Sequence, residues 1–298
     1  MPTTTNPPLV PSGAEVQRAT ASGGSYRVLH GGNRNSRAPV LLLHGGGADN
    51  AAISWCRLLA PLAHDREVIA PDLPGFGYTE GIDPQPTSRE MADRLRELLD
   101  ALGVDAVVVC GVSMGGEVAL QFALHHPDRC SGVVAVAAGG LITRYGSRLL
   151  HSSVWLASRA PDRWLRRLSE TANRFSRQFI RNAVKHRRRL PPGLLEEYVR
   201  EARRPGSGWP YALYVKTAIG PGSMRNSVLH RMPELTVPAL FFHGSDDQLV
   251  DPEGSEQAAR LAPNARHVEV PDCGHWAQLE MHDRFLAELR AFLLARVD

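Results

Sequence analysis

A serine between glycines stands at position 113, in the run Gly111-Val112-Ser113-Met114-Gly115. The run follows the apolar stretch 106–110 and precedes a stretch of helical pattern that stops before Pro127. A sharp strand-to-helix turn would lift the Ser113 hydroxyl out of a sheet and place it where free N–H groups stabilise negative charge. Glycine-rich turns with helix-capping serines are common, however, so this run alone leaves the structural and catalytic interpretations about even.

A serine hydroxyl becomes a nucleophile only when a base removes its proton. His275 lies in the loop after the last predicted strand and before the final helix, which makes it the predicted base. His44 and His243 each end an apolar stretch, and we expect both to be structural. Six further histidines stand in helical or charged contexts and are predicted to be solvated: His125, His126, His151, His186, His230 and His282.

A carboxylate is needed to orient the base and to stabilise its protonated form. The loop after the apolar stretch 239–242 contains Asp246, Asp247 and Asp251. We favour Asp247 as the acid and keep Asp246 as the alternative. Asp251 is predicted instead to cap a helix after Pro252. The order serine, aspartate, histidine is also the order of one known class of catalytic triad.

An oxyanion formed in acyl transfer requires backbone N–H donors that are already in place. The run His44-Gly45-Gly46-Gly47 ends an earlier apolar stretch, and the N–H groups of Gly46 and Met114 are the predicted donors. A phosphate-binding loop is the alternative interpretation of these glycines. It is disfavoured because no Lys-Ser/Thr follows and the spacing is not that of dinucleotide-binding loops.

These residues must be positioned by alternating strands and helices. Extended segments are predicted at 14–19 and 25–30, and short apolar runs typical of strands buried on both faces at 38–43, 67–70, 106–110, 132–137, 239–242 and 267–270. A helix is predicted from Thr87 to Leu102, with a Thr87–Glu90 capping box and Gly103 at its end, and another closes the chain. The pattern predicts an α/β fold with a mostly parallel sheet covered on both faces.

The alternation stops between residues 140 and 231. Apolar side chains there recur at helical intervals: Trp155, Leu156, Trp164, Leu165, Leu168, Phe175 and Phe179. We predict a helical insertion whose aromatic residues form core. The predicted organisation is a loose tail at 1–13, a core domain formed by 14–139 and 232–298, and a helical cap at 140–231. Nineteen of the 34 Lys and Arg lie in 144–231, against five of the 31 Asp and Glu, so the cap is strongly basic. This indicates a solvated helix face, attraction of anionic substrates, or contact with an acidic membrane surface.

Composition excludes several other classes of protein. No apolar run approaches the length of a membrane span, and the N-terminus has no signal-peptide pattern. Cys56, Cys110, Cys130 and Cys273 are far apart, which predicts reduced, mostly buried thiols in a cytoplasmic protein without a zinc site. No recognised nucleic-acid-binding module is present.

Taken together, these motifs resemble the α/β-hydrolase superfamily over residues 25–297. The resemblance rests on the His44–Gly47 run, Asp72-Leu73-Pro74-Gly75, the run around Ser113 and the loop that contains His275. In that family the acid usually stands four residues after the histidine of a His-Gly pair, which selects Asp247. The resemblance implies an α/β-hydrolase fold whose helical cap covers the active site. We predict no cofactor and no metal.

Within the superfamily, Ser113-Met114-Gly115-Gly116 and Gly274-His275-Trp276 look most like the meta-cleavage-product hydrolases, which cleave a carbon–carbon bond in a diketo acid. The sequence departs from them in three places. Trp55 follows Ser54 where those enzymes have asparagine, Val112 replaces an asparagine, and Tyr198 stands where a cap arginine is expected.

We therefore predict a serine hydrolase that cleaves a small carboxylic ester or related acyl compound through an acyl-enzyme. Carbon–carbon bond hydrolysis of a diketo acid is the first alternative, and a non-catalytic ligand-binding protein is the second. The predicted partners are a small acyl substrate, anionic if the cap arginines attract it, and a second copy in a homodimer. The predicted pocket residues are Gly45, Gly47, Trp55, Tyr198 and Trp276.

Overall fold

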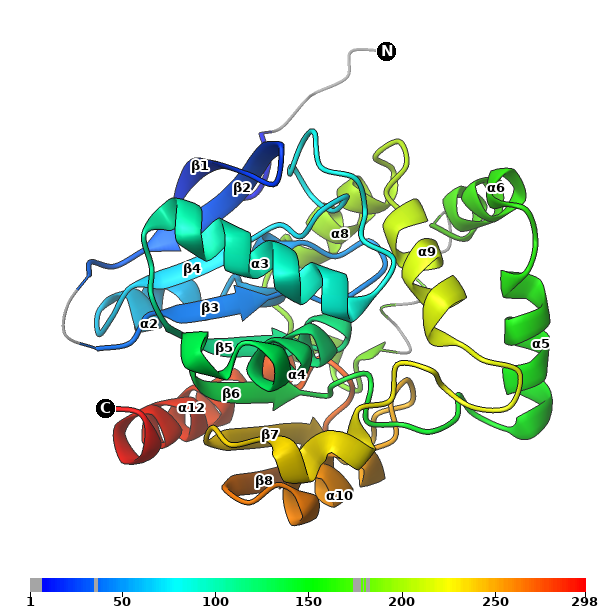
Figure 1. The fold of residues 1–298 in the computed structure, drawn as a ribbon. Helices are drawn as coiled ribbons and strands as arrows, with labels where there is room; N and C mark the ends of the chain where they lie inside the picture. Colours follow the sequence, from blue (N-terminus) through cyan, green and yellow to red (C-terminus); the bar gives the residue numbers. More distant parts are fainter. Residues whose placement is uncertain (1–6, 35–36, 174–177, 179, 181–182) are drawn as a thin grey trace.

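The computed structural model describes residues 7–34, 37–173, 178, 180 and 183–298 of the chain. Its centre is an eight-stranded sheet in the order β1-β2-β4-β3-β5-β6-β7-β8 (Figure 1). Antiparallel pairing joins β1 to β2 and β2 to β4, and every other neighbouring pair is parallel. The strands are β1 (Glu15–Ala21), β2 (Gly24–Gly31), β3 (Val40–Leu43), β4 (Val68–Pro71), β5 (Val107–Val112), β6 (Cys130–Val136), β7 (Ala239–Gly244) and β8 (Ala265–Val270).

Helices cover both faces of this sheet, because alternate strand residues point to opposite sides and both sets are apolar. Leu41 and Leu43 join a buried cluster with Leu95 of α3, while Val40 and Leu42 join a second cluster with α1 and α12. Figure 1 shows α3 and α4 across the near face. The helices of the core are α1 (Ala51–Trp55), α2 (Leu59–Ala63), α3 (Ser88–Leu102), α4 (Met114–His125), α10 (Glu253–Leu261), α11 (Ala277–Glu280) and α12 (His282–Arg296), with short 3-10 turns η1 (Pro127–Arg129) and η4 (Leu229–Glu234).

Local signals in the sequence fix the ends of the core helices. The capping box predicted for α3 is formed: Thr87 and Glu90 each bind the other's backbone N–H, and Gly103 ends the helix at φ 63°. Asp251 accepts a hydrogen bond from the N–H of Glu253 at the start of α10, at 3.0 Å, as its capping position predicts. The prediction of a mostly parallel, two-sided sheet is confirmed, with boundaries that differ by a few residues.

Between β6 and β7 the chain forms helices and no strand within its described residues. Besides η4, they are α5 (Arg148–Ser158), α6 (Asp162–Ala172), the 3-10 turn η3 (Arg187–Arg189), α8 (Leu194–Ala202) and α9 (Trp209–Ala218). Helices α5, α6 and α9 lie beyond the carboxyl ends of the parallel strands (Figure 1). We refer to residues 140–231 as the cap segment.

The prediction that the aromatic residues of the cap segment form core is wrong for Trp164, whose side chain is 54% exposed. Leu165, the next residue, is buried and faces inward. Helical periodicity identified the apolar positions of α6, but Trp164 lies on a face that no described element covers. Phe175 and Phe179 lie outside the described residues.

Candidate active site

Ser113 lies in the turn between β5 and α4, with a backbone φ of 56° and ψ of −119°. A non-glycine residue is strained in this conformation, and the surrounding chain must hold it there. The neighbours allow no side chain: a Cβ on Gly111 would lie 2.0 Å from the oxygen of Gly115, and one on Gly115 would lie 2.3 Å from the oxygen of His44. The pentapeptide thus forms a tight strand-to-helix turn packed against β3.

His275 and Asp247 meet through a short hydrogen bond. Nδ1 of His275 lies 2.7 Å from Oδ2 of Asp247, and both side chains are buried. The other carboxylate oxygen of Asp247 accepts the N–H groups of Leu249, at 2.8 Å, and Val250, at 3.1 Å. His275 is fixed from its backbone as well, because its N–H donates to the oxygen of Ala183 in the cap segment at 2.8 Å.

His243 also contacts Asp247. Its Nε2 lies 2.9 Å from Oδ2, the oxygen that His275 approaches, and its Nδ1 lies 2.7 Å from Oγ of Ser255. Burial alone would raise the pKa of Asp247, but the charge of His275 and the hydrogen bonds of both histidines outweigh it and hold that pKa well below its ordinary value. His243 is therefore a buried histidine at the end of β7 that contacts the predicted catalytic acid.

Asp246 points elsewhere. Its carboxylate accepts a hydrogen bond from Ser245 at 2.9 Å and pairs with Lys185 at 3.1 Å, on the exposed surface. Of the two adjacent aspartates that the sequence left open, only Asp247 contacts His275.

The loop from His44 to Gly47 lies beside Ser113. A Cβ built on Gly45 would be 3.5 Å from that of Ser113. The N–H of Gly45 donates to Asp49 at 2.8 Å, whereas the N–H groups of Gly46 and Met114 have no acceptor within the described part of the chain. Two unpaired N–H groups next to a serine can bind a developing oxyanion.

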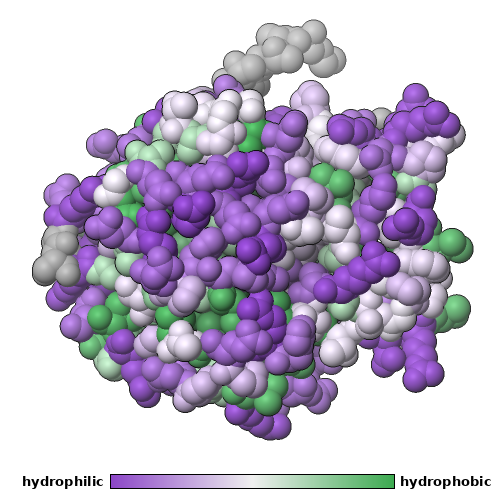
Figure 2. Space-filling view, viewed as in Figure 1, coloured by the Kyte–Doolittle hydropathy of each residue, from purple (hydrophilic) through white to green (hydrophobic). Residues whose placement is uncertain are grey.

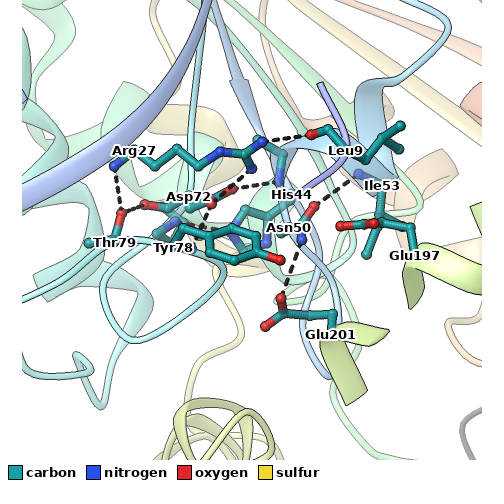
Figure 3. A network of polar contacts seen from close by, with 12 residues as sticks. Leu9, Arg27, His44, Asn50, Ile53, Asp72, Tyr78, Thr79, Glu197 and Glu201 are labelled. Carbon is teal, nitrogen blue, oxygen red and sulfur yellow. Dashed lines mark hydrogen bonds and ion pairs between the residues drawn. The ribbon is translucent and has the colours of Figure 1, made fainter. Parts of the chain in front are cut away.

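A buried polar network holds this glycine loop from behind (Figure 3). Nε2 of His44 accepts the N–H of Leu73 at 3.0 Å, which identifies its role as structural. Asp72 accepts the N–H of Ala51 at 2.9 Å and pairs with Arg27 of β2 at 3.3 Å. Because these groups come from β2, the loop after β4 and the start of α1, the glycine loop is anchored to several elements at once.

Ser113, His275, Gly46 and Met114 open onto one cavity of about 230 Å³. Its wall is mainly apolar and comes from both the core and the cap segment. The lining includes Ile142, Val154, Tyr211, Tyr214, Val215, Ala218, Ile219, Met224, Leu249 and Val250. Within the described residues, no Lys or Arg lines it.

The five predicted pocket residues divide into two groups. Gly45 and Trp276 line the cavity, and Gly47, Trp55 and Tyr198 are not part of its wall. Trp55 was misplaced because α1 is buried along its whole length, so the indole packs in the core against the ring of Phe285. Tyr198 of α8 packs edge-on against Trp276, one layer behind the wall.

Sequence reasoning missed two carboxylates beside the cavity. Asp49 lines it, and burial raises its pKa despite the charge of His44 and hydrogen bonds from Ser54, Gly45 and Asn50. Glu117 is completely buried one turn after Ser113, and burial raises its pKa to about 7. A charged residue inside the apolar pattern of α4 was the available signal for Glu117.

Glu117 connects four segments. Its carboxylate accepts hydrogen bonds from Ser88 of α3, Tyr214 of α9 and Asn226 of the following loop. Tyr214 and Asn226 themselves line the cavity. The described residues contain no group of three or more His, Cys, Asp or Glu that could hold a metal ion, and no helix among them is long and apolar enough to cross a membrane.

A mostly parallel sheet with a serine at a strained strand-to-helix turn, and a histidine–aspartate pair from later loops, defines an α/β hydrolase. Residues 38–281 match the family model described as alpha/beta hydrolase fold, and the chain belongs to that family of enzymes.

Among curated proteins, the chain is 28% identical over 284 residues to a 2-hydroxymuconate semialdehyde hydrolase of Pseudomonas sp. strain CF600, covering 94% of each. It is 29% identical over 290 residues to a 2-hydroxy-6-oxo-2,4-heptadienoate hydrolase of Pseudomonas putida, covering 95% of this chain and 98% of the relative. Both names describe hydrolysis of dienoic or semialdehyde compounds.

Similar solved structures include enzymes of two kinds. A thermophilic esterase from Thermogutta terrifontis has a TM-score of 0.72 and 26% identity, covering 96% of this chain and 100% of that one. A 2-hydroxy-6-oxo-6-phenylhexa-2,4-dienoate hydrolase from Rhodococcus sp. strain RHA1 has a TM-score of 0.74 and 24% identity, covering 95% and 100%. At 24% identity, the similarity to the second structure shows a shared fold and no more.

Proposed function

We propose that the chain is a serine hydrolase of small, uncharged carboxylic esters or related acyl compounds. The observation that supports this choice is the wall of the cavity beside Ser113, which is apolar and has no cation among its described residues. An apolar site with few polar groups binds neutral acyl chains well.

In the proposed mechanism, His275 takes the proton of Ser113 as the hydroxyl attacks the substrate carbonyl. The N–H groups of Gly46 and Met114 hold the resulting oxyanion. Collapse releases the alcohol, protonated by His275, and leaves an acyl-enzyme on Ser113. A water deprotonated by His275 then releases the acid, while Asp247 keeps the imidazole oriented throughout.

Charge at the cavity supports a neutral substrate over an anionic one. A buried substrate carboxylate needs a cation or several donors, since an unpaired charge is costly away from water. Asp49, whose pKa is raised by burial, also lines the cavity beside the glycine loop and adds no positive charge there. None of the cap arginines that were expected to attract anionic substrates lines the cavity within the described residues.

Carbon–carbon hydrolysis is the second candidate, because the two curated relatives are named as such enzymes and the match covers nearly the whole length of each. The same three residues could perform it. Against it, Val112 and Trp55 are completely buried apolar side chains where the related enzymes place asparagines, and Tyr198 replaces the cap arginine. Arg174, Arg177 and Arg181 lie outside the described residues.

Turnover of p-nitrophenyl esters, set beside stopped-flow decay of a coloured dienol acid, separates the two candidates. We expect the larger kcat/KM for ester hydrolysis, and we expect that value to fall by at least about a thousandfold in Ser113→Ala. A larger kcat/KM for the dienol acid would replace the ester proposal with the second candidate.

The four cysteines form no disulfide, which supports a reducing compartment. We therefore propose a cytoplasmic enzyme, and one that uses no cofactor.

A further inference from the structure

Apolar side chains protrude from the outer surface of the cap segment. Leu149 and Leu156 of α5 are 79% and 68% exposed, and Leu168 of α6 is 60% exposed, close to the value for Trp164. Spacings of seven and four residues place each pair on one side of its helix. Figure 2 shows hydrophobic side chains projecting at the edge of the molecule where Figure 1 places α5. We call these four side chains, with the helix surfaces that carry them, the outer cap face.

Cations surround the outer cap face. Between residues 144 and 170 there are six arginines and only two acidic residues, Asp162 and Glu170. All six arginines are exposed, and none forms an ion pair within the described residues: Arg144, Arg148, Arg159, Arg163, Arg166 and Arg167. Apart from Arg166, which contacts α9, these unpaired charges and the exposed leucines make a surface that is both apolar and basic.

The inner sides of the same helices face the cavity and the rest of the protein. Val154 of α5 lines the cavity, and Leu165 of α6 is buried. Arg166 lies over the ring of Trp209 at 4.0 Å, which holds α6 against α9. These contacts hold α5 and α6 against the rest of the protein without the outer leucines. The outer leucines themselves are exposed and pack against no other described element.

We propose that the outer cap face docks on an anionic lipid surface. Interfacial helices combine leucine and tryptophan, which enter the boundary of the bilayer, with arginines that pair with anionic headgroups. A second copy related by a two-fold axis would bring like arginine clusters together, which opposes a symmetric dimer through this face. The proposal does not depend on which acyl compound the enzyme cleaves.

Co-sedimentation of the full-length protein with vesicles tests the docking. We expect binding to vesicles of equal parts phosphatidylglycerol and phosphatidylcholine, little binding to phosphatidylcholine alone, and release by high salt. The variant Arg148→Gln/Arg159→Gln/Arg163→Gln should lower the partition coefficient by about tenfold or more. Leu149→Ser/Leu156→Ser/Leu168→Ser should lower it comparably and leave the dependence on anionic lipid in place.

A control is available on α12, at the opposite end of the molecule from α5 and α6 (Figure 1). Leu294 is 63% exposed there and Arg284 is exposed, so Leu294→Ser/Arg284→Gln removes the same chemistry at another site. This variant should bind as the unmodified protein does. Equal loss in the control, or equal binding to both vesicle types, would overturn the proposal. So would a dimer in sedimentation velocity that dissociates in the leucine variant, because the face would then bind a second copy.

Discussion

Two imidazoles, those of His243 and His275, lie within hydrogen-bond distance of Oδ2 of Asp247. The other carboxylate oxygen, Oδ1, accepts two backbone N–H groups. Every one of these four contacts favours the ionised form, so the carboxylate remains charged at neutral pH despite its burial. In the proposed mechanism, a charged Asp247 holds the proton of His275 on Nδ1, so that Nε2 can take the proton of Ser113. At the scale of single residues, this shared oxygen is the feature on which the proposed chemistry depends.

The adjacent aspartates provide an internal comparison. Asp247→Asn replaces an acceptor with an amide that can stabilise the wrong tautomer of His275, and we expect kcat for ester hydrolysis to fall by roughly four orders of magnitude. Asp246→Asn removes only a surface ion pair with Lys185 and should leave kcat within about twofold. Comparable losses in both variants would contradict the assignment of Asp247 alone as the residue that orients His275.

His243 should act through Asp247 rather than on the substrate. His243→Phe removes one hydrogen bond to the charged carboxylate, and we expect kcat to fall by about tenfold to a hundredfold with little change in KM. His243→Gln keeps a donor near the position of Nε2 and should recover part of that loss. If the glutamine variant recovers thermal stability but no kcat, His243 serves only the fold.

At the scale of secondary-structure elements, Glu117 joins α3, α4 and α9 at a point directly behind Ser113. Burial raises its pKa to about 7, although its three hydrogen-bond donors oppose the shift. The folded protein therefore retains a proton on this group in a pH range where an unfolded glutamate has lost it. The cap segment is thus held to the core through a group that titrates near neutral pH.

This coupling predicts a pH-dependent stability. The unfolded chain binds fewer protons than the folded one between the ordinary pKa of 4.5 and about 7, so the free energy of unfolding should fall as the pH rises through that window. The stabilisation is complete below pH 4.5 and lost above 7, and it amounts to roughly 3 kcal/mol.

Urea unfolding at several pH values checks this, with Glu117→Gln as the reference, because glutamine does not ionise. The free energy of unfolding of the unmodified protein should decline relative to that of the variant as the pH rises through the window. Parallel curves for the two proteins would contradict a raised pKa at Glu117.

The elements of the core were predictable because their signals are local. Apolar runs, the Thr87–Glu90 capping box and the glycines around Ser113 each determine the conformation of a few neighbouring residues. In the cap segment, periodicity distinguishes one side of a helix from the other, but it does not reveal whether another element covers that side. That is why Trp164 was predicted as core and lies exposed.

At the scale of the whole molecule, the order of strands brings Ser113, Asp247 and His275 to the same edge of the sheet. The residues alone left Asp246 and Asp247 both open, and spacing within a known family favoured the second. The orientation of Trp55 and the burial of Asp49 depend on how α1 packs across distant segments, and no short pattern encodes that packing. The cavity wall is hard to read from the sequence for the same reason, since the core and the cap segment build it together.

Labelling by a fluorophosphonate reports on whether Ser113 is an activated nucleophile. Such probes react with a serine only where a base and an oxyanion site act together. Intact-mass and peptide analysis should find one adduct, on Ser113, in the unmodified protein. The adduct should be absent in Ser113→Ala and form much more slowly in His275→Ala. An unmodified Ser113 after prolonged exposure, or an adduct confined to another residue, would contradict the proposed triad.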